Sequence, residues 1–497
     1  MLAMTSPIYQ TEQIREFERL AAERYSLGDE RLMQKAGKAA LDFMLRRWGQ
    51  AETIVVFCGG GHNGGDGYVL AALAKERGLK VKVHHVGDLA NMKPLTKRMH
   101  DAAKNAGVSI VAFEEKSEIH ADLIVDALCG IGVNTVLRDD MVQAIRCIQR
   151  SQTPIFSLDI PSGIDADTGN VLGVAVHANA TLTFIGYKLG LLTGSGAAYT
   201  GELAMHDLQL PAELHTYVAP IAEKDHFSLF SHYLKPRARD WHKGLSGHVL
   251  VVGGGEGFAG AARLAAEAAL RVGAGRVTLA VWPGNADLMN VHYPELMCQG
   301  VATPDALKLL LERVDVVVLG PGLTQTDWGQ ALWQAVIETE LPLVLDADGL
   351  NLLVGTSLNK ENWVMTPHPG EAARLLGVSV PDVQSDRLSS AKALANQFGG
   401  VAVLKGAGTV VVAPNSLPMI CDKGNPGMAT AGMGDVLSGV IGGLMAQSIP
   451  LSEAAKLGVL VHAMAGDLAA KEGERGMIAS DLLPYLRRLM NHSSGAA

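Results

Sequence analysis

Short β-branched runs that end in glycine-rich turns and then pass into helical patterns recur along the chain of 497 residues. Residues 53–58 lead into the turn 59–67, and residues 248–252 lead into the turn 253–257. Strands that alternate with helices in this way predict parallel, doubly wound sheets. Ligands of such sheets bind beyond the carboxyl ends of the strands. We therefore expect an α/β fold with its sites at those ends.

The alternation is interrupted once, over residues 211–240, where Pro211, Pro220 and Pro236 surround a charged stretch. Such a stretch is typical of a linker, so we expect two domains, 1–225 and 226–497. The predicted strands of the first domain are 53–58, 80–86, 109–113, 122–127 and 154–160, with helices over 11–25, 30–48, 68–77, 95–106 and 140–150. Those of the second are 248–252, 276–281, 314–319, 343–345, 364–366 and 401–404, with a helix over 258–272.

Composition excludes several classes of function. The net charge is −9 and the chain has no run of Lys or Arg, which argues against nucleic-acid and anionic-membrane partners. No apolar run has the length of a membrane span and the first residues have no apolar signal core, so we expect a cytoplasmic protein. The five cysteines are scattered without CxxC spacing, which argues against disulfides and a zinc site.

Three predicted strand ends in the first domain carry polar side chains. The first is followed by Asn63 and Asp66, the fourth contains Asp126, and the fifth contains Asp159 and is followed by Ser162. The oxygens of Asn63, Asp126 and Ser162 could hold a cation beside a phosphate. Each could instead be a loop residue that satisfies local backbone. Their shared edge of one sheet favours a site.

The stretch 425–443 in the second domain combines glycines with a single carboxylate. Glycines allow a sharp turn with uncovered N–H groups, and Val436, Leu437, Val440, Ile441 and Leu444 then repeat at helical spacing. A glycine-rich loop that enters a helix favours phosphate oxygens. Asp435, at the start of that helix, is either an N-cap or a base aimed at a hydroxyl.

A second loop of this kind, 405–409, carries a lysine, two glycines and a threonine. Alone it is a weak signal, but together with the loop at 427–435 it suits a nucleotide whose phosphates end at Asp435. His368 follows the predicted strand 364–366, where it could contact substrate or simply form a turn.

Three motifs of the first half resemble the NAD(P)HX epimerase family, which interconverts the R and S forms of hydrated NADH and NADPH. They are Gly-His-Asn-Gly-Gly-Asp-Gly-Tyr-Val at 61–69, Val-Asp-Ala-Leu-Cys-Gly-Ile-Gly at 125–132 and Leu-Asp-Ile-Pro-Ser-Gly-Ile at 158–164. The resemblance implies a Rossmann-like domain that binds K⁺ through Asn63, Asp126 and Ser162. It implies Asp159 as the proton-transfer residue, with a purely structural N-cap role as the alternative. The implied substrate contacts are His62, Asn63, Gly64, Gly65, Asp66, Gly130, Ile131, Gly132, Val133, Asn134, Thr135, Val136 and Asp159.

Two positions depart from the family pattern. His62 stands where the family usually has Asn, and Ile131 stands where Thr is common. We expect His62 to turn its backbone inward, so that function survives. The loop after Gly132 is the part of the substrate site that the resemblance supports least.

The second half resembles the ADP-dependent NAD(P)HX dehydratase of the ribokinase-like superfamily. The motifs are Gly-Pro-Gly-Leu at 320–323, Asp-Ala-Asp-Gly-Leu-Asn at 346–351, Thr-Pro-His-Pro-Gly-Glu at 366–371, Lys-Gly-Ala-Gly-Thr at 405–409, and 425–437. By resemblance, Gly260, Gly322, His368 and Asp435 contact the hydrated cofactor. The implied ADP contacts, with Mg²⁺ on the phosphates, are Lys405, Gly406, Ala407, Gly408, Thr409, Asn425, Pro426, Gly427, Met428, Ala429, Thr430, Ala431, Gly432, Met433 and Gly434.

Both halves in one chain, in this order, resemble the bifunctional NAD(P)H-hydrate repair enzymes. The implied reaction is phosphorylation of the ring hydroxyl by ADP, which gives AMP, followed by loss of phosphate. Asp435 would take the hydroxyl proton. The expected partners are NAD(P)HX and ADP as small-molecule substrates, and we expect a homo-oligomer.

Two other hypotheses fit parts of the sequence. The second half could be a kinase of a vitamin or sugar hydroxyl, which would release a stable phosphorylated product. The first half could be an interaction module without activity, although the presence of Asn63, Asp126, Asp159 and Ser162 argues against that.

Overall fold

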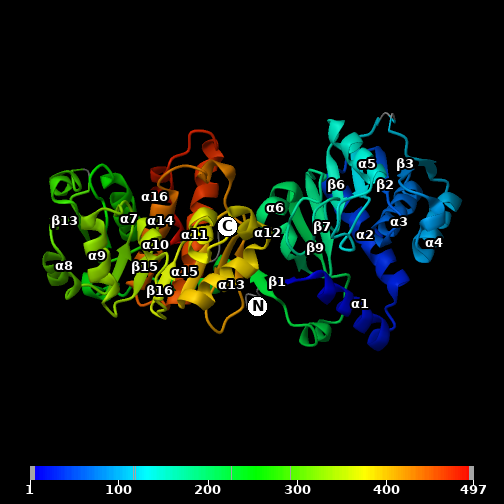
Figure 1. Cartoon of the computed structure of the whole chain (residues 1–497). Coiled ribbons are helices and arrows are strands. Elements are labelled where there is room, and N and C mark those ends of the chain that lie inside the picture. The colour runs from blue at the N-terminus through cyan, green and yellow to red at the C-terminus, as the bar shows by residue number, and fades with distance from the viewer. Residues whose placement is uncertain (1–5, 116, 118, 225, 292, 492–497) are drawn as a thin grey trace. The chain divides into compact units, whose positions relative to one another are not determined.

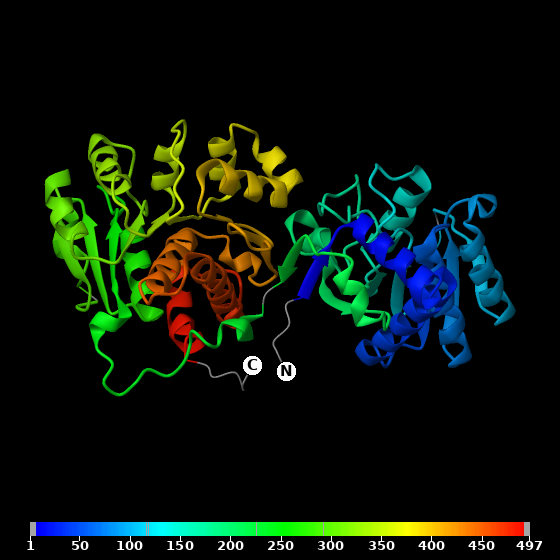
Figure 2. The same ribbon diagram turned by 90° about the horizontal axis from the view of Figure 1, so that it is seen from below.

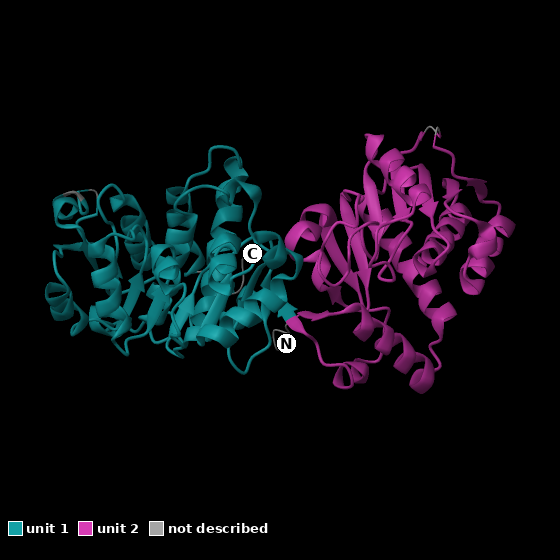
Figure 3. Cartoon of the chain, in the orientation of Figure 1, with its two compact units in different colours: residues 1–5, 223–497 teal, residues 6–222 magenta. Residues whose placement is uncertain are grey.

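The structure is a computed structural model that describes residues 6–491 apart from 116, 118, 225 and 292. The described residues form two compact units, 6–222 and 223 onward (Figure 3). The predicted boundary, residue 225, lies outside the described residues. The predicted linker 211–240 contains some regular structure, because it includes the strand β10 (Ala222–Lys224) between two short 3₁₀ helices, Ala212–Thr216 and Phe227–Phe230.

The N-terminal unit contains a seven-stranded sheet in which all strands are parallel (Figure 1). Chain order reverses between β2 and β5, and such a reversal opens a crevice at the carboxyl ends of the strands. A separate parallel pair joins β1 (Ser6–Tyr9) to β8 (Tyr187–Lys188). In spatial order the sheet runs β4 (Ser109–Ala112), β3 (Lys80–His85), β2 (Thr53–Cys58), β5 (Leu123–Ala127), β6 (Ile155–Leu158), β7 (Ala180–Phe184) and β9 (Glu202–His206).

Alternating residues of the central strands fill two separate cores. Ile54 and Val56 pack into one core, whereas Val55 and Phe57 pack into the other, as the two-residue period of a strand requires. The first core is covered by α1 (Thr11–Tyr25), α2 (Asp29–Arg47), α3 (His62–Glu76) and α4 (Pro94–Asn105), and the second by α5 (Asp139–Arg150). The short helix α6 (Gly194–Thr200) precedes β9.

The helix after β2 begins six residues before the predicted start at Tyr68, at His62. The glycines there mark close packing rather than a loop. A Cβ atom on Gly64 would stand 1.9 Å from the carbonyl oxygen of Gly59, and one on Gly67 would stand 2.6 Å from the Cβ of Ala127. The first turn of α3 therefore lies directly against the carboxyl ends of β2 and β5.

The sheet of the C-terminal unit is parallel from β13 to β17 and antiparallel from β17 to β19. Each of the six strands predicted in this unit is present, with its ends within two residues of the predicted ones. In spatial order the sheet runs β13 (Met297–Gly300), β12 (Arg276–Val281), β11 (His248–Val252), β14 (Val316–Leu319), β15 (Leu343–Leu345), β16 (Trp363–Met365), β17 (Val401–Leu404), β18 (Thr409–Val412), β19 (Met419–Cys421) and β10.

Helices cover both faces of this sheet, and Figure 2 shows the yellow helices on one face and the orange and red ones on the other. One face packs against α7 (Ala259–Arg271), α14 (Met433–Met445), α15 (Leu451–Ala469) and α16 (Leu483–Leu489). The remaining helices are α8 (Pro304–Leu311), α9 (Asp327–Ile337), α10 (Asp348–Leu353), α11 (Pro369–Leu376), α12 (Val380–Ser385) and α13 (Arg387–Phe398). No described helix is both long and apolar enough to span a bilayer.

The central contact of that core is between α14 and α7, and it depends on glycine. A Cβ atom on Gly439 would stand 1.9 Å from the carbonyl oxygen of Ala265, so the two helices approach backbone to backbone. The predicted apolar residues of α14, from Val436 to Leu444, are buried against this core. This packing fixes the position of the first turn of α14.

We expect Gly439→Ala to lower the free energy of unfolding of the C-terminal unit by about 1–3 kcal/mol, because the added methyl group has no space between two backbones. Tryptophan fluorescence during chemical denaturation measures this, since five of the six tryptophans lie after residue 222. Gly260→Ala is the matched control, because it lies on α7 with nothing within 4 Å of its Cβ position. Equal stability of the two variants would contradict the packing argument.

Candidate active sites

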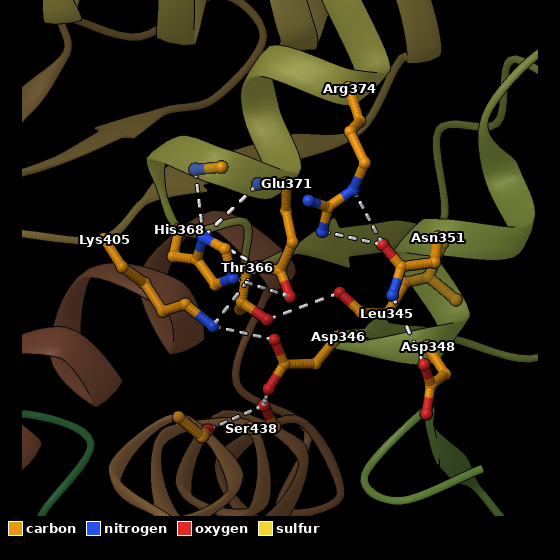
Figure 4. A network of polar contacts seen from close by, with 12 residues as sticks. Leu345, Asp346, Asp348, Asn351, Thr366, His368, Glu371, Arg374, Lys405 and Ser438 are labelled. Atoms are coloured by element: carbon orange, nitrogen blue, oxygen red, sulfur yellow. Dashed lines mark hydrogen bonds and ion pairs between the residues drawn. The ribbon is translucent and has the colours of Figure 1, made fainter. Parts of the chain in front are cut away.

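A polar network gathers at the carboxyl ends of three neighbouring strands of the C-terminal unit (Figure 4). Asp346 follows β15, Glu371 lies in the first turn of the helix that follows β16, and Lys405 follows β17. Ser438, on α14, completes the network from the opposite side in Figure 4. The sequence placed polar groups at these strand ends, and the structure brings them together.

The centre of this network is an ion pair between a buried carboxylate and a partly exposed ammonium. The Lys405 ammonium donates to Oδ1 of Asp346 at 2.8 Å, and the Ser438 hydroxyl donates to Oδ2 of the same carboxylate. Burial by itself raises the pKa of Asp346, but the Lys405 ammonium and the Ser438 hydroxyl outweigh it and hold the pKa below its usual value. Asp346 is therefore a permanently charged anchor for Lys405.

Asp435 lies in the first turn of α14, as the third residue of the helix. Gly432, with φ of +89°, occupies the N-cap position, so the alternative that Asp435 is the N-cap is wrong. Burial raises the pKa of Asp435 to about 7, and repulsion from Asp346 and Glu371 contributes. Asp435 is thus a carboxylate that can exchange a proton near neutral pH.

The two glycine loops meet at this point. A Cβ atom on Gly434 would stand 3.1 Å from the Lys405 ammonium, so glycine leaves space for the lysine side chain. The backbone of the loop 405–409 is held by the buried Arg387, whose Nη2 donates to the carbonyl oxygens of Leu404, Lys405 and Gly408 at 3.2, 3.1 and 3.4 Å. The buried Arg387 guanidinium therefore fixes the backbone of this loop.

The loop that precedes α14 is fixed in a similar way. The Asn425 side chain accepts from the Gly427 N–H at 3.1 Å and donates to Asp467 at 3.0 Å. Asp467, on α15, also accepts from the Gly424 N–H at 3.1 Å. Hydrogen bonds to a neighbouring helix thus order the first part of the predicted nucleotide loop.

His368 and Glu371 form a reciprocal cap at the start of α11. His368 Nδ1 accepts from the Gly370 N–H at 3.0 Å, and the Glu371 carboxylate accepts from the His368 N–H at 2.7 Å. Burial raises the pKa of Glu371 to about 7, although Lys405, 3.8 Å away, opposes the rise. His368 is exposed and serves as a helix cap, and its contact with substrate stays a prediction.

Gly322 and Gly260 lie at neighbouring strand ends. Gly320 and Gly322 follow β14, and a Cβ atom on Gly320 would stand 1.8 Å from the carbonyl oxygen of Asp346, which places the end of β14 beside the network. A Cβ atom on Gly322 would stand 2.6 Å from the carbonyl oxygen of Phe258, just before α7. Gly260, near the start of α7, is exposed.

The N-terminal unit contains a cavity of about 670 Å³ at the carboxyl ends of β2, β5 and β6. Exposed cationic side chains contribute to its wall, namely Arg15, Lys93 and Arg138. Gly64 and Gly65 do not line the cavity, because Gly64 packs on Gly59 and Gly65 packs on Met33. Asn134 does not line it either. The predicted site residues in the wall are His62, Asn63, Asp66, Gly130, Ile131, Gly132, Val133, Thr135, Val136 and Asp159.

Asn63, Asp126 and Ser162 converge around the peptide of Cys129. The Asn63 amide donates to the Cys129 carbonyl oxygen at 2.7 Å, and the Ser162 hydroxyl accepts from the Cys129 N–H at 2.9 Å. Ser162 also donates to Asp126 at 2.6 Å. Asp126 is buried without an ion pair among the described residues, and the Asn63 side-chain oxygen is buried there without a hydrogen-bond partner. These buried oxygens make the surroundings of the Cys129 peptide electronegative.

Asp159 adopts φ of +63° and directs its carboxylate toward the end of β7. The first described helical element after Asp159 is the 3₁₀ helix Leu189–Leu191, so the alternative that Asp159 caps a helix is wrong. The Lys188 ammonium donates to Oδ1 of Asp159 at 2.5 Å, and both side chains are buried. Asp159 is therefore a charged wall residue of the cavity.

Sequence reasoning missed several residues of the two sites. Lys188 follows an apolar strand at a distance of 29 residues from Asp159, and no local pattern marks it. Asp346 and Glu371 lie in motifs that follow predicted strands. Their position at the carboxyl ends of those strands could have identified them as site residues. Ser438 and Arg387 form hydrogen bonds at the site only because the fold packs α14 and α13 against it, which no local pattern in the sequence indicates.

Comparisons with known proteins match both units. Residues 249–488 match a family model described as NAD(P)H-hydrate dehydratase, and residues 29–190 match one described as YjeF-related protein N-terminus. The chain is 47% identical to a bifunctional NAD(P)H-hydrate repair enzyme of Coxiella burnetii, over 97% of this chain and 99% of the relative. It is 44% identical to an enzyme of the same name from Escherichia coli, over 97% and 94%.

Among solved structures, an ADP/ATP-dependent NAD(P)H-hydrate dehydratase from Bacillus subtilis, co-crystallised with ATP and Mg²⁺, is similar to the C-terminal half. It is 29% identical with a TM-score of 0.50, over 55% of this chain and 98% of that chain. The expected fold class, a doubly wound N-terminal sheet and a ribokinase-like C-terminal unit, is confirmed. Identity at this level over nearly the full length of both chains shows the family, and the chain belongs to the bifunctional NAD(P)H-hydrate repair enzymes.

Proposed function

We propose that this protein restores hydrated NADH and NADPH in two steps. The N-terminal unit interconverts the R and S forms of NAD(P)HX, and the C-terminal unit dehydrates the S form at the expense of ADP, giving AMP and phosphate. The observation that carries the proposal is the position of Asp435 in the first turn of α14 beside Lys405, where burial raises the pKa of its carboxyl group to about 7. A general base is most effective when its pKa lies near the working pH.

In the C-terminal unit, Asp435 takes the proton of the ring hydroxyl as that oxygen attacks the terminal phosphorus of ADP. The bond from that phosphorus to the bridging oxygen breaks, and AMP leaves with the bonding electrons. The N–H groups at the start of α14 and the Lys405 ammonium stabilise the charge of the phosphoryl group in transfer. The lone pair of the ring nitrogen then expels phosphate from the ring carbon. Loss of a proton from the adjacent ring carbon to solvent restores the dihydropyridine.

The nucleotide site fits Mg²⁺ that arrives with phosphates. Among the described residues, no group of three or more His, Cys, Asp or Glu has the geometry to hold a metal. Mg²⁺ is commonly bound by one or two carboxylates plus substrate phosphates, and it would shield phosphate charge here. The Bacillus subtilis dehydratase, which was co-crystallised with ATP and Mg²⁺, supports this assignment.

In the N-terminal unit, the cavity has a volume typical of small-molecule sites. Its exposed cations, Arg15, Lys93 and Arg138, suit the phosphates of a dinucleotide. The hydrated carbon bears a hydroxyl and the ring nitrogen. Asp159 takes the hydroxyl proton as the carbon–nitrogen bond breaks to an aldehyde, and delivers it to the nitrogen. Rotation and ring closure by the reverse steps give the other epimer.

The cluster of oxygens around Cys129 fits K⁺. Asn63 has a buried side-chain oxygen without a partner, and the buried Asp126 has no counter-charge among the described residues. Oxygen donors of this kind suit a hard cation. Bound K⁺ would supply a fixed positive charge beside the substrate phosphates, and Asn63, Asp126 and Ser162 would hold it.

We expect Asp435→Asn to lower kcat for dehydration of the S form by about 100- to 10,000-fold, because the general base is lost. Epimer exchange should keep its wild-type rate. Asp305→Asn is the matched control, since its side chain is 91% exposed. Wild-type dehydration by Asp435→Asn would show that another group takes the proton.

Dehydration should lose activity in acid with a midpoint near pH 7, because protonated Asp435 cannot accept the hydroxyl proton. Glu371 adds like charge, which stabilises the protonated form of Asp435 and raises its pKa. Glu371→Gln should therefore move the midpoint of kcat to lower pH, by about 1 unit. Glu340→Gln, 90% exposed, is the control. A midpoint that stays in place or rises would refute this coupling.

Replacing a large organic cation by K⁺ at constant ionic strength should protect residues 123–129 from hydrogen exchange. At about ten times the dissociation constant, the gain in stability is about 1.4 kcal/mol. Asp126→Asn should abolish the gain, whereas Asp139→Asn, at an exposed position, should keep it. Equal protection by K⁺ in wild-type protein and Asp126→Asn would argue against this cation site.

A further inference from the structure

A buried ammonium lies in the wall of the N-terminal cavity, and the proton transfer described above does not use it. Lys188 is 1% exposed and lines the cavity beside Asp159. Its ammonium donates to Oδ1 of Asp159 at 2.5 Å, to the Thr183 hydroxyl at 2.9 Å and to the Phe184 carbonyl oxygen at 2.7 Å. Each of the three N–H groups of the ammonium thus has an acceptor, so the position of its charge is fixed.

These contacts divide the Asp159 carboxylate into two different oxygens. Oδ1 accepts from Lys188, from the Thr183 hydroxyl at 3.1 Å and from the Phe184 N–H at 3.3 Å. Within the described part of the chain, Oδ2 has no hydrogen-bond donor. A Cβ atom on Gly130 would stand 3.6 Å from Oδ2, which places this oxygen against the 130–136 wall of the cavity. Oδ1 is held, and Oδ2 faces the cavity.

The surroundings of Asp159 are otherwise rich in carboxyl groups. Asp66 of α3 and Glu18 of α1 line the same cavity, and Arg15 and Asp29 lie near Glu18. Burial raises the pKa of Glu18 to about 7 and that of Asp66 well above its usual value, and the charge of Asp159 contributes to both shifts. These groups add like charge around Asp159, and the Lys188 ammonium is the described cation that pairs with it.

We propose that Lys188 is a positioning residue for epimerisation, which supplies the counter-charge of Asp159 at Oδ1 and so presents Oδ2 as the atom that exchanges the proton. The inference rests on the proposed function of the N-terminal unit. Lys188 does not touch the reacting carbon in this account, because its donors are already occupied by Asp159, Thr183 and Phe184. Its effect must therefore pass through the charge and orientation of Asp159.

The test uses the full chain, the purified R epimer and no ADP, so that only formation of the S epimer is followed. Lys188→Met should lower kcat by at least about 100-fold with KM changed by less than about threefold, because the base is altered and the binding wall is not. Lys188→Gln, which keeps a hydrogen-bond donor without the charge, should show the same loss. Lys38→Met removes an exposed ammonium of the same unit and should match wild type.

The pH profile separates this role from a merely structural one. A neighbouring ammonium stabilises negative charge, so the acidic limb of kcat should move to higher pH in both Lys188 variants. Hydrogen exchange of residues 123–127, a buried strand of the N-terminal unit, shows whether each variant is folded there. Lys188→Gln carries the test if Lys188→Met is not folded. Wild-type kcat and an unmoved acidic limb in the folded variant would overturn the proposal. Absence of epimerisation by the wild-type protein would instead overturn the function on which it rests.

Discussion

The Lys405 ammonium is the interaction on which the C-terminal site depends. It pairs with Asp346 at 2.8 Å and lies 3.8 Å from Glu371, while Asp435 faces the same cluster from α14. Three carboxyl groups this close would repel one another and take up protons if no cation lay among them. The lysine leaves Asp346 charged, whereas Glu371 and Asp435 have pKa values of about 7. The Lys405 charge therefore keeps Asp346 ionised as its partner and leaves Asp435 able to accept a proton. The same charge lies where a phosphoryl group can bind.

The N-terminal site also places a lysine among several carboxyl groups, but with a different arrangement. A single lysine, Lys188, satisfies one oxygen of Asp159 and leaves the other toward the cavity. In both units, glycine backbones allow the helix N-terminus to approach the sheet, at Gly64 against Gly59 and at Gly434 beside Lys405. Backbone N–H groups at such termini attract anions, which suits substrates that carry phosphates. The two halves therefore use the same elements, a lysine–aspartate ion pair and a glycine-lined helix start, for two different reactions.

Much of the fold follows from the sequence, because runs such as 248–252 and 401–404 are β-branched, short and bounded by glycine. The predicted start of α3 was wrong. The glycines of 62–67, which usually favour a turn, allow the first residues of this helix to pack closely. The sequence correctly predicted Asp435 at the start of a helix. It could not predict the pKa of Asp435, because that pKa depends on burial and on Asp346 and Glu371, which are distant in the sequence. Lys188 could not be found from sequence for the same reason, because only the tertiary structure places it against Asp159.

The most direct test of the account is the yield of NADH from an equal mixture of the two epimers of hydrated NADH, with ADP, Mg²⁺ and K⁺. If both units act, the intact chain converts the whole mixture faster than the epimers exchange in buffer alone. AMP and phosphate are then released in step with NADH. Rapid conversion that stops when the S form is exhausted would contradict the epimerase assignment. A stable phosphorylated product in place of NADH would contradict the dehydratase assignment.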